Sequence, residues 1–200
     1  MAAPIEFYFD FSSPFGYLAS EKIEQLAARY GREVMWRPYL LGAVFKITGG
    51  VPTMLVPIKG DYYRRDFARS ARYLGVAYRQ PTTFPINSVT PSRAFYWLDS
   101  KDPVRARELA HALYRAYFVD DVDISITENT LAFAAKLALD ADEVRAGIND
   151  AAVKDRTKSE VEKAIAKGAF GSPYIIVDGE PFWGSDRLDQ VDKWLATGGW

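Results

Sequence analysis

The chain has 200 residues, of which 48% are hydrophobic, and it contains no cysteine and one histidine. Its 25 basic and 26 acidic residues are interspersed and leave a net charge of −1, which argues against nucleic acid or an anionic membrane as a partner. The composition excludes disulfides and thiol catalysis, and one histidine leaves little material for a catalytic triad or a metal site, so we expect no metal.

The N-terminal part of the chain predicts a strand, a helix and a second strand. Residues 5–11 alternate β-forming and polar side chains, and residues 14–30 carry apolar side chains at helical spacing after an initial proline. Residues 33–39 are rich in β-branched and aromatic side chains and predict the second strand. Residues 40–60 contain four glycines and two prolines and predict an irregular connection.

The middle of the chain predicts helices, apart from a proline-rich loop at 80–93. The start signals are a proline at the first helical turn, Asp102 as a cap, and two capping boxes, Ser125 with Glu128 and Asp140 with Glu143. The predicted helices run over about 62–74, from Pro91 or Ser92 onward, over 103–117, from 125 to 139, from 140 to 148, and from 151 to 167.

The pattern changes again after Gly168. Residues 174–178 and 180–183 predict two strands joined by a turn at Asp178-Gly179, and residues 185–196 predict a closing helix.

A β-α-β unit and a β-β-α unit therefore bracket a helical block. This order is the layout of a thioredoxin-like α/β fold, and the helical block is the variant found in bacterial disulfide oxidoreductases. We expect a discontinuous thioredoxin-like domain formed by residues 1–60 and 168–200, with residues 61–167 as a helical insertion domain.

The start of the first predicted helix is the position where such folds place their reactive group. Free backbone N–H groups and the helix dipole favour an anion there. Ser13-Pro14-Phe15-Gly16 stands where a redox enzyme has Cys-Pro-x-Cys, so both sulfurs are missing. This pattern favours a thiolate that arrives on a ligand, although Ser12-Ser13-Pro14 also fits a plain helix cap.

Four segments together resemble a known enzyme family. FYFDFSSPFGYLA, VPIKGDY, FP-IN-S and GAFGSPYIIVDGEPFWGSDRLD are similar to the 2-hydroxychromene-2-carboxylate isomerases and their relatives, the kappa-class glutathione transferases. The resemblance runs over nearly the whole chain. It implies a glutathione-dependent enzyme in which Ser13, with Ser12 as its neighbour, faces the glutathione sulfur.

The energies fit such a role for Ser13. Lowering the pKa of a thiol from ~8.5 by about 1.5 units requires ~2 kcal/mol of extra stabilisation for the anion. One hydrogen bond to a charged group supplies roughly 1.5–3 kcal/mol and a helix N-terminus ~0.3–2 kcal/mol. Because no nearby base is evident, we expect Ser13 to donate a hydrogen bond to the thiolate and not to act as a nucleophile.

The same resemblance assigns further glutathione contacts. Pro173 is expected in the cis form facing the first helix, with the backbone of Ser172 pairing with the extended tripeptide. An ordinary turn proline is the alternative. Lys59 is expected at the glycine carboxylate of glutathione.

The segment WGSDRLD supplies the remaining contacts. Ser185 and Asp186 are expected at the γ-glutamyl end, with Arg187 close by. The alternative for these three residues is simply a capped helix with a solvated face.

Residues in and after the proline-rich loop are candidates for substrate binding. Phe84, Asn87 and Arg93 lie there, and Arg93 is suited to the carboxylate of an aromatic acid. We expect His111, in the middle of a helix, to be a packing or surface residue. Further aromatic residues could line a pocket or pack in the core: Tyr62, Tyr63, Trp97, Tyr114, Tyr117 and Trp183. One departure is Gly49-Gly50, where the family tends to have Gly-Asn.

The resemblance implies an isomerase that interconverts 2-hydroxychromene-2-carboxylate and trans-o-hydroxybenzylidenepyruvate in naphthalene catabolism, with a small aromatic carboxylate as substrate and a homodimeric assembly. The alternatives are glutathione transfer to another electrophile, and a non-enzymatic thioredoxin-like binding or chaperone module. Neither a signal peptide nor an apolar run of ~20 residues is visible, so we expect a cytoplasmic protein without a membrane partner.

Overall fold

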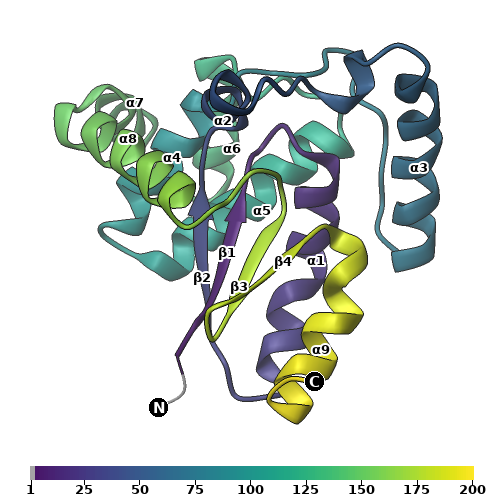
Figure 1. Cartoon of the computed structure of the whole chain (residues 1–200). Helices are drawn as coiled ribbons and strands as arrows, with labels where there is room; N and C mark the ends of the chain where they lie inside the picture. Colours follow the sequence, from purple (N-terminus) through teal and green to yellow (C-terminus); the bar gives the residue numbers. More distant parts are fainter. Residues whose placement is uncertain (1–2) are drawn as a thin grey trace.

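The computed structural model describes residues 3–200, which fold around a four-stranded mixed sheet (Figure 1). The strands are β1 (Ile5–Phe9), β2 (Val34–Pro38), β3 (Tyr174–Val177) and β4 (Glu180–Trp183), in the order β2-β1-β3-β4. β1 runs parallel to β2, whereas β3 is antiparallel to both β1 and β4. This topology confirms the predicted thioredoxin-like α/β fold.

Helices make up most of the remaining described residues. They are α1 (Pro14–Ala28), α2 (Leu41–Thr48), α3 (Lys59–Leu74), α4 (Val89–Asp99), α5 (Pro103–Phe118), α6 (Thr127–Lys136), α7 (Ala141–Asn149), α8 (Ala151–Ala166) and α9 (Leu188–Thr197), with 3₁₀ turns η1 (Thr53–Leu55) and η2 (Ser185–Arg187). In the range 3–200, no helix combines the length and the apolar character needed to cross a membrane.

The prediction of an irregular connection over residues 40–60 is wrong, because α2 forms there. Its first N–H, that of Leu41, donates to the carboxylate of Asp10 at 2.7 Å, and Gly49 ends the helix with a positive φ of 71°. The cap at the N-terminus comes from a residue 31 positions earlier in the chain. A local pattern of glycines and prolines does not contain this information.

Two other predicted helix starts are also corrected. The capping box at Ser125 does not form, because its hydroxyl donates to Asp123 at 2.5 Å and α6 begins two residues later at Thr127. The closing helix begins at Leu188 after the turn η2, not at Ser185. Asp140, by contrast, caps α7 as predicted.

The sheet buries both faces because successive side chains of a strand point to opposite sides. Ile5, Phe7 and Phe9 of β1 enter one cluster with α1, α5 and α9, and Figure 1 shows α1 and α9 together beside the sheet. Tyr8 points to the other face, where it packs in a second cluster with Tyr39 and residues of α2 and α8.

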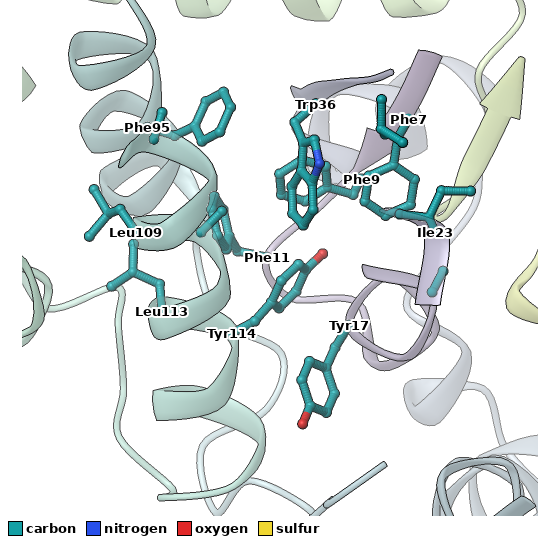
Figure 2. Packing of buried hydrophobic residues seen from close by; sticks show 14 of the residues in the cluster. Phe7, Phe9, Phe11, Tyr17, Ile23, Trp36, Phe95, Leu109, Leu113 and Tyr114 are labelled. Atoms are coloured by element: carbon teal, nitrogen blue, oxygen red, sulfur yellow. The ribbon is translucent and has the colours of Figure 1, made fainter. Parts of the chain in front are cut away.

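The helical segment between the two halves of the sheet shares this core. Phe9 lies 6.2 Å from the Phe95 ring of α4 and 5.5 Å from the Tyr114 ring of α5, and Figure 2 shows Leu109 and Leu113 in the same cluster. Dense aromatic packing of this kind fixes β1 and the helices as one body. The loop that follows β1 is therefore held on a rigid support.

His111 of α5 lies between two carboxylates of α1 and packs in the protein, as expected from the sequence. Its Nε2 lies 3.3 Å from Glu24 and its Nδ1 3.6 Å from Glu21, and its ring packs on Trp36 at 4.8 Å. Burial by itself would lower the pKa of His111, but the hydrogen bonds and charges of the two glutamates outweigh burial and raise the pKa to about 9.

Replacing His111 with Gln is expected to flatten the pH dependence of stability. Because the folded pKa lies above the unfolded value, the stabilisation is complete below about pH 6.5 and is lost as the pH rises through 9. The variant should lose up to about 3 kcal/mol at pH 6 and much less at pH 10, measured by urea unfolding. An equal loss at both pH values would contradict the assigned pKa.

Candidate functional site

A cavity of about 980 Å³ opens at the end of the sheet where β1 leads into α1. Its base is formed by the loop after β1 and the loop before β3, and its walls by α2, the start of α3, the proline-rich loop and the turn after β4. A second cavity of about 530 Å³ lies between α4, α7 and α8. It is lined by the aromatic candidate Trp97 but by none of the residues predicted to bind glutathione or substrate. The first cavity is therefore the candidate site.

Most of the residues predicted from sequence meet at this cavity. Its lining includes Ser13, Phe84, Asn87, Ser172, Ser185, Asp186 and Arg187, which come from four separate segments of the chain. Pro173 follows the lining residue Ser172, and the bond between them is cis, as expected. Of the aromatic candidates, Tyr62, Tyr63 and Trp183 line the cavity, whereas Tyr114 and Tyr117 lie in the core.

Two of the predicted charged residues do not reach the cavity lining. Lys59 is the exposed first residue of α3. Arg93 lies within α4, where its Nε is buried without a hydrogen-bond partner among residues 3–200. The structure thus does not bring these two cations together with Ser13.

The Ser13 hydroxyl joins the start of α1 to the loop before β3. Its Oγ accepts the Gly16 N–H at 3.0 Å and donates to the Ser172 carbonyl at 2.8 Å. Pro14 carries no N–H, and the N–H of Phe15 has no hydrogen-bond partner in the described part of the chain. The helix start therefore combines a buried hydroxyl with one unused backbone donor beside the cavity.

The loop before β3 is held against this helix start by further hydrogen bonds. Asp10 donates its N–H to the Ser172 Oγ at 3.0 Å, and Tyr39 donates its hydroxyl to the Gly171 carbonyl at 2.6 Å. The carbonyl of Pro173 accepts the Gly184 N–H at 3.1 Å, which connects the turn after β4. The cavity base is thus a network of mutual contacts among segments distant in sequence.

Asp10 is a central residue of the site that the sequence analysis did not identify. Its side chain accepts N–H groups from Ser12 and Leu41, both at 2.7 Å, and it is only 3% exposed. Burial raises the pKa of the Asp10 carboxyl, while the hydrogen bonds from Ser12, Leu41 and Ser88 act in the opposite direction. An acidic residue directly after a buried strand was the available signal.

Aromatic side chains from α1, α3 and the proline-rich loop pack together in one wall of the cavity. Phe15 packs edge-on against Phe67 at 4.9 Å, and Phe67 lies 5.9 Å from Tyr63 and 6.5 Å from Phe84. Phe67 thus contacts two aromatic residues that were predicted, Tyr63 and Phe84, and one that was not, Phe15. Phe67 itself was not predicted. This wall can hold a flat aromatic group next to the polar base.

Comparison with known families identifies the chain as a member of one of them. The model of the DSBA-like thioredoxin domain matches residues 4–196, and the chain belongs to that family.

Within that family, the chain is similar to two named groups of enzymes. The chain is 29% identical to 2-hydroxychromene-2-carboxylate isomerase of Sphingobium xenophagum, over 98% of this chain and 99% of the relative. It is also 29% identical to glutathione S-transferase kappa 2 of Caenorhabditis elegans, over 96% of this chain and 91% of the relative. A solved 2-hydroxychromene-2-carboxylate isomerase superposes with a TM-score of 0.85 at 26% identity, covering 96% and 94% of the two chains. The resemblance seen in the sequence motifs is thereby confirmed, and the relatives support an enzyme of this isomerase and transferase group.

Replacing Gly16 with Ala is expected to destabilise the protein, although alanine is the better helix former. A Cβ at Gly16 would lie 2.6 Å from the Ser172 Oγ and 2.8 Å from the Tyr114 hydroxyl, both of which bind the Asp10 backbone. We expect a loss of about 1–3 kcal/mol in the free energy of unfolding.

Gly42 provides the matched control, because a Cβ there meets nothing within 4 Å. Its replacement by Ala should leave the Tm unchanged or raise it. If both variants gained stability, the close approach at Gly16 would be disproved.

Proposed function

We propose that the protein binds glutathione in the cavity at the start of α1 and uses its thiolate to isomerise 2-hydroxychromene-2-carboxylate. One observation carries the proposal: a cysteine-free helix start, beside a cavity, presents the Ser13 hydroxyl and the unused Phe15 N–H. Such groups favour an anion at this position. The similarity to named isomerases over nearly the full length supports the same assignment.

Binding of the thiolate requires one exchange of hydrogen bonds. In the structure the Ser13 hydroxyl donates to the Ser172 carbonyl. We propose that the hydroxyl rotates to donate to the sulfur, and that a backbone N–H of the tripeptide replaces it at Ser172. Because Gly16 still donates to the Ser13 Oγ, the hydroxyl remains held at the helix start. The Ser172 carbonyl exchanges one donor for another, so the exchange leaves no buried carbonyl unpaired.

The proposed reaction uses the sulfur as the only nucleophile. The thiolate adds to the ring carbon next to the benzene ring and forms a carbon–sulfur bond. The ring double bond shifts by one position, the ring carbon–oxygen bond breaks, and the oxygen leaves as a phenolate. The former double bond is now a single bond and rotates. The phenolate then gains a proton and the enol hydroxyl loses one, so that the double bond re-forms, the thiolate is expelled, and trans-o-hydroxybenzylidenepyruvate and glutathione are released. The chain's own residues stabilise the anion and orient the aromatic ring on the wall of Phe15 and Phe67.

The second candidate function is transfer of glutathione to another electrophile at the same site. The similarity to a kappa-class transferase at the same level of identity favours it. The two reactions differ in their use of glutathione, which isomerisation regenerates and transfer consumes. Stoichiometric loss of glutathione with an aryl halide, without isomerisation of the chromene acid, would establish the transferase.

Replacing Ser13 with Ala is expected to lower glutathione-dependent turnover of the chromene acid by roughly tenfold to a thousandfold. This range corresponds to the loss of one charged hydrogen bond of ~1.5–4 kcal/mol. The measurement follows the absorbance of the chromene acid with and without glutathione. Ser13→Thr, which keeps a hydroxyl, should retain more activity than Ser13→Ala.

Ser20→Ala is the control for a purely structural effect. Ser20 is buried in the same helix and donates to the Tyr17 carbonyl at 2.7 Å, outside the cavity lining. It should lose stability comparable to Ser13→Ala and keep its turnover. Equal turnover of Ser13→Ala and the unmodified protein would remove Ser13 from the mechanism. Absence of any heat of glutathione binding at millimolar ligand would favour the non-enzymatic module.

A further inference from the structure

The proposed isomerisation moves a proton in addition to the sulfur. The ring oxygen of the substrate leaves as a phenolate that must gain a proton, while the enol hydroxyl must lose one. A side chain of the cavity that can both give and take a proton would serve these two steps. The acids and phenols of the cavity lining are Asp10, Asp66, Asp186, Tyr62 and Tyr63.

The three aspartates already have partners within the protein. Asp10 accepts one backbone N–H on each carboxylate oxygen. Asp66 pairs with Arg69, which follows it by one turn of α3. Asp186 lies 3.5 Å from its neighbour Arg187. The two tyrosines are therefore the stronger candidates for a proton carrier.

Tyr62 is the tyrosine whose hydroxyl has a charged partner. Its oxygen accepts an N–H of Arg69 at 3.0 Å, and the Arg69 guanidinium lies 5.4 Å from the centre of the Tyr62 ring. Because the oxygen is the acceptor in this bond, the hydroxyl hydrogen is left to donate, and it has no acceptor among residues 3–200. The guanidinium is also a hydrogen-bonding partner for a negative charge that forms on this oxygen.

Tyr62 lies at one end of the aromatic wall. Its ring is 5.8 Å from Tyr63, which lies 5.9 Å from Phe67, and Phe67 packs against Phe15 at 4.9 Å. Phe15 belongs to the start of α1, where the sulfur is expected beside Ser13. A substrate ring on this wall would therefore lie between the sulfur and the Tyr62 hydroxyl.

We propose that Tyr62 passes the proton of the enol hydroxyl to the phenolate oxygen of the substrate, and that Arg69 positions Tyr62 for this transfer. The inference rests on the proposed function. The Tyr62 hydroxyl gives its proton to the phenolate, and a new O–H bond forms. The tyrosinate then takes the enol proton, the electron pair of the broken O–H bond forms the ketone, the carbon–carbon double bond re-forms and the thiolate leaves.

This cycle returns Tyr62 to its starting state, so it consumes no further reactant. Tyrosine is itself a phenol, and the first transfer therefore takes place between two groups of the same chemical kind. Arg69 lies outside the cavity lining and acts only through Tyr62.

Replacing Tyr62 with Phe keeps the ring on the wall and removes the hydroxyl. We expect kcat for the chromene acid to fall about a hundredfold, while the KM for the acid and the calorimetric affinity for glutathione stay nearly unchanged. At constant pH and ionic strength, added imidazole buffer should restore part of the turnover of this variant, because a small acid can replace the lost proton carrier. The unmodified protein should not respond to the buffer, and a packing defect would not be rescued by it.

The positioning role of Arg69 has its own test. Arg69→Gln should lower kcat by about tenfold with little change in KM, and Arg69→Lys, which keeps a charged donor, should lose less. In the Tyr62→Phe background, Arg69→Gln should cause no further loss, because the two residues act as one unit. A purely structural effect of Arg69 would instead lower turnover equally in both backgrounds and contradict this role.

Tyr73→Phe is the matched control, because Tyr73 is an exposed tyrosine of the same helix and lies outside the cavity lining. It should leave kcat unchanged. If Tyr62→Phe behaves like Tyr73→Phe while the unmodified protein binds glutathione and turns over the acid, the role of Tyr62 is disproved and the proposed function stands. A loss with buffer rescue in Tyr63→Phe and not in Tyr62→Phe disproves it as well. If the unmodified protein neither binds glutathione nor turns over the acid, both proposals are overturned.

Discussion

The contact on which the site depends is the bridge that the Ser13 hydroxyl makes between the Gly16 N–H and the Ser172 carbonyl. These atoms belong to the start of α1 and to the loop before β3, which the antiparallel pairing of β1 with β3 brings together. The bridge aligns the two segments that thioredoxin-like folds use for reactive groups. A hydroxyl can make it without carrying any redox chemistry of its own.

Asp10 extends this bridge to the rest of the cavity. Its backbone N–H and carbonyl bind Ser172, Ser13 and Tyr114, while its carboxylate binds the first N–H of α2. A buried carboxylate is costly unless its oxygens are satisfied, and here each oxygen has a backbone donor at 2.7 Å. The residue therefore couples the position of α2, and with it one cavity wall, to the geometry at Ser13.

The sequence predicted the elements that are encoded locally. The first strand follows from alternation and the second from its β-branched and aromatic residues. The start of α5 follows from the pair Asp102-Pro103, and the Asp102 carboxylate caps the helix as expected. α2 was missed because its cap is a tertiary contact with Asp10. Ser125 was misread because a nearer acceptor, Asp123, takes its hydroxyl. In each case a non-local or competing hydrogen bond decided the outcome.

The sequence predicted some residues of the candidate site and missed others. Ser13, Ser172 and the turn at 185–187 were found because they sit in short motifs with a fixed place in the fold. Asp10 was missed because its signal, an acidic residue directly after a buried strand, is common and weak. Its importance comes from its contacts with Leu41 and Ser172, which are distant in sequence, and local sequence patterns do not show such contacts.

The most direct test is the ionisation of the glutathione thiol in the bound state, followed by the ultraviolet absorbance of the thiolate during a pH titration. We predict that the thiol pKa falls by about 1.5 units on binding to the unmodified protein, and that Ser13→Ala reverses much of this shift. A bound thiol that titrates like free glutathione in the unmodified protein would contradict the central claim that the start of α1 stabilises a ligand's sulfur anion.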